Sequence, residues 1–134
     1  MMDKNIRNIE YFELQIGGFF CGFTRIRLEK TSSGYFLGYY PGFANPEDAK
    51  KEEITRTAYE TILEKVISCN LLNWEEEYIN PEIDDGTQWT IRLKIENEIE
   101  REWYGCNLYP GKEEWNSFIQ TMNTLPIPSL DYEI

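Results

Sequence analysis

The sequence predicts an α+β domain, a two-layer sandwich in which a mainly antiparallel sheet of about five strands carries two helices on one face. Three observations predict this class: alternating, aromatic-rich segments before residue 41, a second alternating pair between residues 87 and 104, and two segments with apolar residues at helical spacing. Their order is βββαββα. A chain of 134 residues suffices for one core, so we expect a single domain over residues 1–134.

The first three predicted strands form a meander. "EYFELQI" places Phe12, Leu14 and Ile16 on one face, and "FFCGFTRIRLE" follows it. Between them, Gly17 and Gly18 predict a two-residue hairpin turn, because paired glycines adopt the positive φ angles that such turns need. A turn at "KTSSG" leads into the third strand, "YFLGYY".

The first helix is predicted to begin at Pro46 and to end at Ser68 or Cys69. Asn45 can cap the helix, and proline suits the first helical position. The residues that form its apolar face are Ile54, Ala58, Tyr59, Ile62, Leu63, Val66 and Ile67. For the acidic segment that follows, residues 71–86, we expect a loop with at most one short, irregular strand.

The two later strands are predicted to join through a three-residue turn at residues 96–98. A two-residue turn would place the carboxylate of Glu102 on the buried face, which is costly. The three-residue turn instead pairs Ile91 with Trp103 on the buried face and Arg92 with Glu102 on the solvent face.

The same register has three further consequences. It pairs Ile95 with Ile99, and it makes Asn97 the candidate for a left-handed backbone conformation. It also places Arg101 on the apolar face opposite Leu93, where an unpaired guanidinium would be expensive. Two interpretations stay open: the strand lies at an edge and Arg101 extends to water, or Arg101 is a fixed cation at the lip of a pocket.

A corner connects the last strand to a second amphipathic helix. Gly105, Asn107, Tyr109 and Pro110 form the predicted structural corner, in which the Asn107 side chain can bind nearby backbone groups. The helix is predicted from Lys112 to about Asn123, with Trp115, Phe118, Ile119 and Met122 on its apolar face. Two prolines then favour an extended C-terminal tail over residues 126–134.

The composition argues against several classes of function. Twenty-four acidic against thirteen basic residues give a net charge of −11, which disfavours direct nucleic-acid binding and favours either a basic protein partner or solubility alone. The chain has no histidine, the commonest general base and metal ligand, and no recognisable catalytic motif, so we do not expect an enzyme. Three dispersed cysteines and no apolar leader or membrane span predict a cytoplasmic protein without a membrane partner.

The acidic segment at residues 75–85 raises the question of a cation site. Its carboxylates are the ligand type that Mg²⁺ and Ca²⁺ prefer, but against an EF-hand loop starting at Asn80 the required glycine is Asp85 and the terminal glutamate is Ile91. The favoured interpretation is a solvated acidic loop that ends in a turn at Gly86. We predict no cofactor and no metal.

Two short motifs carry a resemblance. "DGTQW" at residues 85–89 and "GCNLYP" at residues 105–110 are followed by Trp115 and Phe118. This arrangement resembles a family of small bacterial proteins of unknown function, which carry a DGxxW strand, a second strand, a G-x-N-x-Y/F-P corner and an aromatic helix. The resemblance covers the chain from residue 85 onward and implies this architecture and a bacterial source. In the family the helical aromatic lies closer to the proline than Trp115 does here, and no catalytic residue is implied.

Three functions are compatible with these observations. The first is a protein-interaction module, such as an immunity-type or other inhibitor, that binds a basic partner through an acidic, aromatic-rich surface. The second is a small-ligand or cation-binding protein, with a carboxylate-based enzyme as its less favoured form, and the third is a nucleic-acid mimic. The residues that we assign to a hypothetical binding site are Arg101, Trp103, Asp84, Asp85, Tyr39, Tyr40 and Trp74. We favour the interaction module.

Overall fold

A computed structural model describes residues 6–18, 22–42, 49–82 and 86–134. Within these residues the chain forms one sheet of seven strands in the order β4-β3-β2-β1-β6-β7-β5. The strands are β1 (Ile9–Gly18), β2 (Gly22–Thr31), β3 (Gly34–Tyr40), β4 (Lys50–Ile54), β5 (Glu77–Ile79), β6 (Thr87–Ile95) and β7 (Arg101–Cys106). Neighbouring strands are antiparallel, except that β5 runs parallel to β7.

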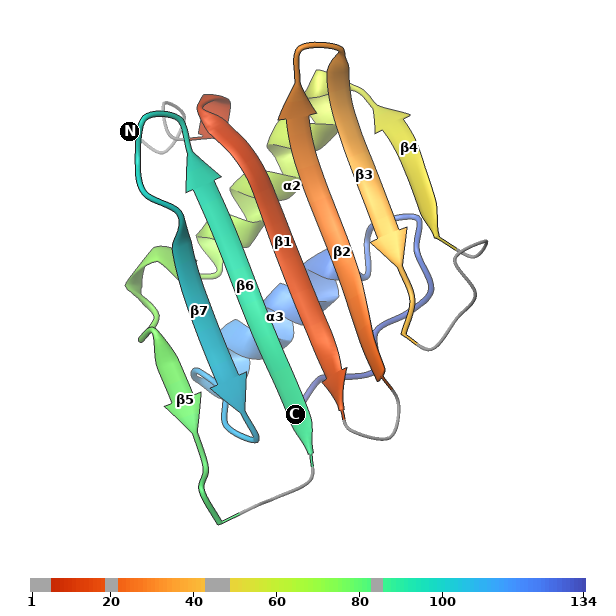
Figure 1. Cartoon of the computed structure of the whole chain (residues 1–134). Helices are drawn as coiled ribbons and strands as arrows, with labels where there is room; N and C mark the ends of the chain where they lie inside the picture. Colours follow the sequence, from red (N-terminus) through yellow and green to blue (C-terminus); the bar gives the residue numbers. More distant parts are fainter. Residues whose placement is uncertain (1–5, 19–21, 43–48, 83–85) are drawn as a thin grey trace.

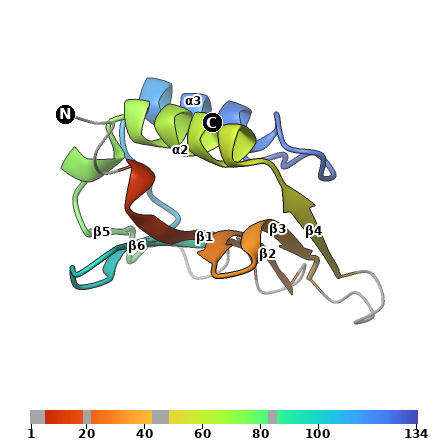
Figure 2. The same cartoon turned by 90° about the horizontal axis from the view of Figure 1, so that it is seen from above.

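Two helices, α2 (Arg56–Ser68) and α3 (Lys112–Met122), lie on one face of this sheet (Figures 1 and 2). The α+β class and the mainly antiparallel sheet with two helices are therefore confirmed. The predicted number of about five strands is wrong, because β4 was not predicted and the short strand allowed within residues 71–86, which is β5, was not counted. None of the helices in the described residues is long and apolar enough to cross a membrane.

The predicted hairpin turn at Gly17 and Gly18 is wrong. Both glycines belong to β1, where they lie opposite Phe23 and Gly22 of β2, and the connection itself falls at residues 19–21, outside the described residues. A Cβ atom on Gly17 would lie 2.0 Å from the carbonyl oxygen of Gly22. This glycine therefore permits close approach of two strands rather than a turn.

The predicted start of the first helix is also wrong. Residues 50–54 form β4, paired with β3, and α2 begins only at Arg56. The Thr55 hydroxyl caps the helix by accepting a hydrogen bond from the Ala58 amide at 3.0 Å. Ile54, which fitted the helical spacing, instead lies opposite Tyr35 in the sheet. The predicted cap at residues 45 and 46 lies outside the described residues.

The register predicted for β6 and β7 is confirmed. Ile91 pairs with Trp103, Arg92 pairs with Glu102, and Asn97 has a left-handed backbone with φ of 63°. The predicted pairing of Ile99 is wrong, because β7 begins two residues later and the Ile99 side chain is 90% exposed.

The core lies between the sheet and the helices. All four tryptophans, Trp74, Trp89, Trp103 and Trp115, are buried there. The tail at residues 126–134 closes one side of the core, since Leu130 is buried and the Trp115 indole donates a 2.8 Å hydrogen bond to the carbonyl oxygen of Tyr132. The helices and the tail thus cover the apolar face of the sheet (Figure 2).

Candidate functional site

The outer edge of β7 is paired along only half of its length. The ladder between β5 and β7 begins at the pair Glu77 and Tyr104 and continues toward Cys106. If β5 extended backward in the same parallel register, Glu75 would lie opposite Glu102. The chain leaves the sheet instead, so the first residues of β7 have no strand beside them on this side among the described residues.

Trp74 explains why the chain leaves the sheet. It follows the 3₁₀ helix η2 (Leu71–Asn73), and its side chain is buried in the core, where its indole donates a 3.2 Å hydrogen bond to the carbonyl oxygen of Cys69. Its ring contacts those of Trp89 and Trp115, with centroids 6.2 and 6.3 Å apart. Burial of so large a side chain contributes more stability than the two further β5–β7 pairs that the chain would form if it stayed in the sheet.

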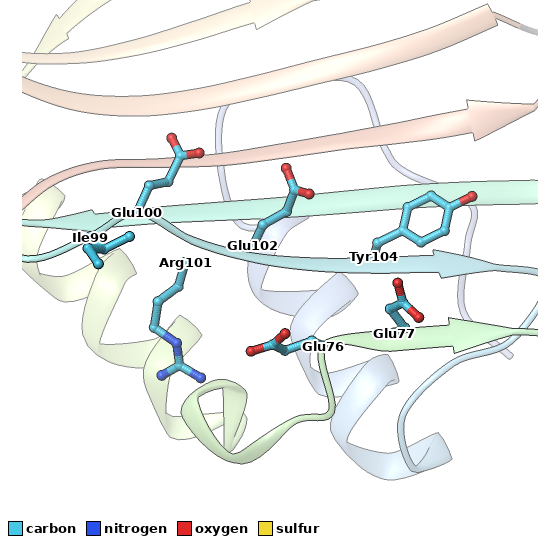
Figure 3. A pocket seen from close by; sticks show the side chains of 7 residues that line it. All are labelled: Glu76, Glu77, Ile99, Glu100, Arg101, Glu102 and Tyr104. Atoms are coloured by element: carbon cyan, nitrogen blue, oxygen red, sulfur yellow. The ribbon is translucent and has the colours of Figure 1, made fainter.

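The space beside the unpaired half of β7 is a hollow of about 540 Å³ (Figure 3). Its lining residues are Glu76, Glu77, Ile99, Glu100, Arg101, Glu102 and Tyr104. Because side chains alternate along a strand, Glu100, Glu102 and Tyr104 project on the face of the sheet opposite α2 and α3, whereas Arg101 projects on the side of these helices (Figure 3). Four carboxylates and one guanidinium thus line the hollow, with Glu100 and Glu102 on the opposite face of the sheet from Arg101.

The four glutamates differ in how they are compensated. Glu102 accepts a 2.8 Å hydrogen bond from Nε of Arg92, and Glu100 accepts one from the Tyr11 hydroxyl. Burial, followed by this bond to Glu100, raises the pKa of Tyr11 to about 12. Glu76 and Glu77 are exposed and form no ion pair among the described residues. The hollow therefore keeps uncompensated negative charge.

Arg101 combines parts of both interpretations that the sequence left open: β7 is not the outermost strand, but its first residues, Arg101 included, lie beside no strand among the described residues on the side away from β6. Its side chain is exposed and lines the hollow. The guanidinium lies 4.6 Å from the ring centroid of Trp103 and donates a 3.3 Å hydrogen bond to the carbonyl oxygen of Leu72. Trp103 is buried beneath it, and its indole nitrogen has no hydrogen-bond partner among the described residues.

The structure does not bring the remaining predicted binding residues to this place. Trp74 is a core residue, and Tyr39 is half-buried against the core. Tyr40 projects on the other face, where the guanidinium of Arg25 lies 4.3 Å from its ring centroid. Asp84 and Asp85 lie outside the described residues.

The predicted corner residues have structural contacts. A Cβ atom on Gly105 would lie 2.1 Å from the indole of Trp89, so only glycine fits at this pair. Asn107 has a φ of 59°, and its amide donates a 2.9 Å hydrogen bond to the carbonyl oxygen of Thr87. The Tyr109 ring packs on Trp115, and Pro110 is buried.

A buried carboxylate that the sequence pattern did not reveal lies on the face of the sheet opposite α2 and α3. Glu13 is only 4% exposed, and its oxygens lie 3.2 Å from Arg27 and 3.1 Å from Arg92. Arg25 approaches it at 3.9 Å. Since Arg92 also binds Glu102, a chain of alternating charges runs from the centre of this face to the hollow. The alternation in β1 indicated that Glu13 faces outward, but not that cross-strand arginines bury it.

Within the described residues, no group of three or more histidine, cysteine or acidic side chains is placed to hold a metal ion. This finding covers residues 75–82 of the acidic segment. The chain matches no protein-family model and none of the curated proteins. The resemblance to the small bacterial family therefore stays a prediction.

Proposed function

We propose that this protein is an acidic interaction module that binds a basic segment of a partner protein, in the manner of an immunity-type or other inhibitor. The observation that carries the proposal is the hollow at the edge of β7, where four glutamates and one arginine surround about 540 Å³ of open space. The net charge of −11 gives the whole molecule the same sign as the hollow.

Charge at this hollow favours binding for two physical reasons. The long-range field accelerates the approach of a cationic partner, and the effect weakens as salt screens it. At short range, Glu76 and Glu77 lack cationic partners among the described residues, so a lysine or arginine can pair with them without displacing an existing ion pair. Ile99, 90% exposed at the rim, adds apolar contact area.

The other two functions receive less support. The small-ligand hypothesis requires a concave site over the apolar face of the sheet, and α2, α3 and the tail cover that face (Figure 2). Nucleic-acid mimicry requires carboxylates aligned on one face, whereas pairs of acidic residues also occur on α2, at Glu60 and Glu64, and on α3, at Glu113 and Glu114.

Site-specific crosslinking tests the proposal. A photoreactive amino acid in place of Ile99 puts the crosslinker at the rim of the hollow, in otherwise unchanged protein within a lysate of its native host. We expect one predominant, basic crosslinked partner at low salt and its loss at about 0.5 M salt, where screening acts over a few ångströms. The double variant Glu76→Gln/Glu77→Gln is expected to reduce the yield at least severalfold.

The matched control is Glu52→Gln/Glu64→Gln, which removes two negative charges from exposed positions on β4 and α2. It keeps the net charge equal to that of the hollow variant and is expected to retain most of the crosslinked product. An equal loss in both variants would assign binding to net charge alone. An acidic partner would contradict the proposal.

A further inference from the structure

The backbone of Glu102 is oriented toward the hollow. The Tyr104 amide donates a 2.9 Å hydrogen bond to the carbonyl oxygen of Glu76, on the side of β5. Successive residues of a strand direct their N–H and C=O groups to opposite sides, so Glu102, two positions earlier, directs its groups to the same side as Tyr104. No strand of the described residues lies beside it there. The edge therefore offers a donor and an acceptor to an incoming chain.

We propose that the partner segment binds in an extended conformation along this edge, forming backbone hydrogen bonds with Glu102 and continuing the line of β5. This inference rests on the proposed function, because it specifies how the basic segment occupies the same hollow. Addition of a strand to a free sheet edge is a general mode of peptide recognition, in which backbone hydrogen bonds supply affinity and alternate side chains supply specificity.

Side-chain alternation then specifies the sequence of the segment. A residue directly opposite Glu102 projects on the same face as Glu102 and Glu100, next to Glu77. That position favours lysine or arginine. The two neighbouring residues of the segment project toward the guanidinium of Arg101, which repels a cation. The partner segment is therefore expected to alternate basic with uncharged residues.

The same charges argue against a second copy of this chain as the occupant. Antiparallel pairing of two β7 edges would bring glutamates at positions 100 and 102 against the same residues of the other copy, and like charges opposite each other destabilise a sheet. The other edge strand, β4, also fits poorly. Its Lys50 shares a face with Glu52, so each lysine would bring a glutamate into the hollow.

Backbone methylation of a peptide probe separates strand addition from simple charge attraction. The probe is a capped peptide of alternating lysine and threonine, compared with one peptide N-methylated at its lysines and another N-methylated at its threonines. All three carry the same charge. In antiparallel addition, the peptide residue directly opposite Glu102 forms the backbone hydrogen bonds with Glu102. In parallel addition, the two peptide residues on either side of that position form them. We expect one methylated peptide to bind about tenfold more weakly and the other to bind almost as the parent does.

Amide hydrogen exchange gives an independent measurement on the protein. The parent peptide is expected to slow exchange of the Glu102 amide at least about tenfold, because a strand would protect that group. If the parent binds but both methylated peptides bind equally well and the Glu102 amide stays unprotected, strand addition is overturned while the proposed function stands. If no peptide binds to the hollow, both are overturned.

A pair of variants provides a second test in the whole protein. Glu102→Ala and Glu102→Pro both remove the carboxylate, but only proline removes the outward N–H and obstructs the edge. Both are checked for folding by thermal unfolding. We expect Glu102→Pro to lose at least tenfold more affinity for the parent peptide than Glu102→Ala. Equal affinities in two folded variants would overturn strand addition.

Discussion

Glu13 and Arg92 lie 3.1 Å apart on the sheet face opposite α2 and α3, and this ion pair connects β1, in the middle of the sheet, to β6, the neighbour of β7. The side chain of Glu13 is almost completely buried, with the guanidinium groups of Arg27 and Arg92 beside it. Arg92 continues to Glu102, which lines the hollow. The position of the Glu102 carboxylate, which lines the hollow, therefore depends on the ion pair between β1 and β6.

Replacement of Glu13 by glutamine is expected to destabilise the protein by about 2–4 kcal/mol, because it leaves Arg27 and Arg92 close together without their shared counter-charge. Urea unfolding measures the loss. Glu52→Gln, which removes the same charge at an exposed position, is expected to change stability by less than about 0.5 kcal/mol. Similar losses in both variants would show that Glu13 acts only through net charge.

Gly105→Ala is expected to destabilise the protein by about 3 kcal/mol or more, since the added Cβ atom would lie 2.1 Å from the buried indole of Trp89. A shift of the tryptophan fluorescence should accompany the loss. Gly111→Ala is the matched control, because its nearest neighbour would be the flexible carboxylate of Glu114 at 3.3 Å. If both variants unfold at the same denaturant concentration, the close packing at Gly105 is not what the structure indicates.

The elements whose side-chain period is unambiguous could be predicted from the sequence. Strict alternation in β6 and the cost of burying Glu102 were enough to specify the register with β7. Helix α3 was predicted within one residue, because its aromatic residues recur at helical spacing. Both predictions depended on local pattern, and the β6–β7 register depended also on the high cost of a buried charge.

The elements that were missed depend on distant contacts. β4 consists almost entirely of charged residues, and only its pairing with β3 makes it a strand. The hollow results from burial of Trp74, whose aromatic partners Trp89 and Trp115 lie more than ten residues away in the sequence. The sequence did indicate Arg101 as unusual, but which glutamates meet it depends on where β5 begins.

Stability is expected to fall as the pH rises from about 10 to about 12. The pKa of Tyr11 is raised from 10.0 to about 12 by burial and by Glu100, so the folded protein keeps a proton that the unfolded chain releases. The resulting stabilisation is complete below pH 10 and is lost as the pH rises toward the pKa of Tyr11 in the folded protein. Burial also raises the pKa of Tyr59.

Ultraviolet absorbance of tyrosinate, measured together with unfolding at each pH, checks this expectation. Tyr11→Phe should flatten the decline in stability between pH 10 and 12. Tyr104→Phe is the comparison, because the pKa of Tyr104 is also raised but its hydroxyl does not bind Glu100. A decline of equal steepness in the wild type and in Tyr11→Phe would contradict the role assigned to Tyr11.

Arg101→Gln is expected to strengthen binding of the alternating lysine–threonine peptide about threefold, because it removes the only cation among the described residues that line the hollow. Stability should fall by less than about 1 kcal/mol, since the guanidinium is exposed and contributes one contact with Trp103 and one hydrogen bond to Leu72. Calorimetric titration at several salt concentrations measures the affinity, and the salt dependence should become steeper.

Arg56→Gln removes the same charge from the exposed start of α2 and is expected to have a smaller effect, because a distant charge is screened. Weaker peptide binding by Arg101→Gln would instead make Arg101 a contact residue for the peptide, and would contradict a hollow that selects cations.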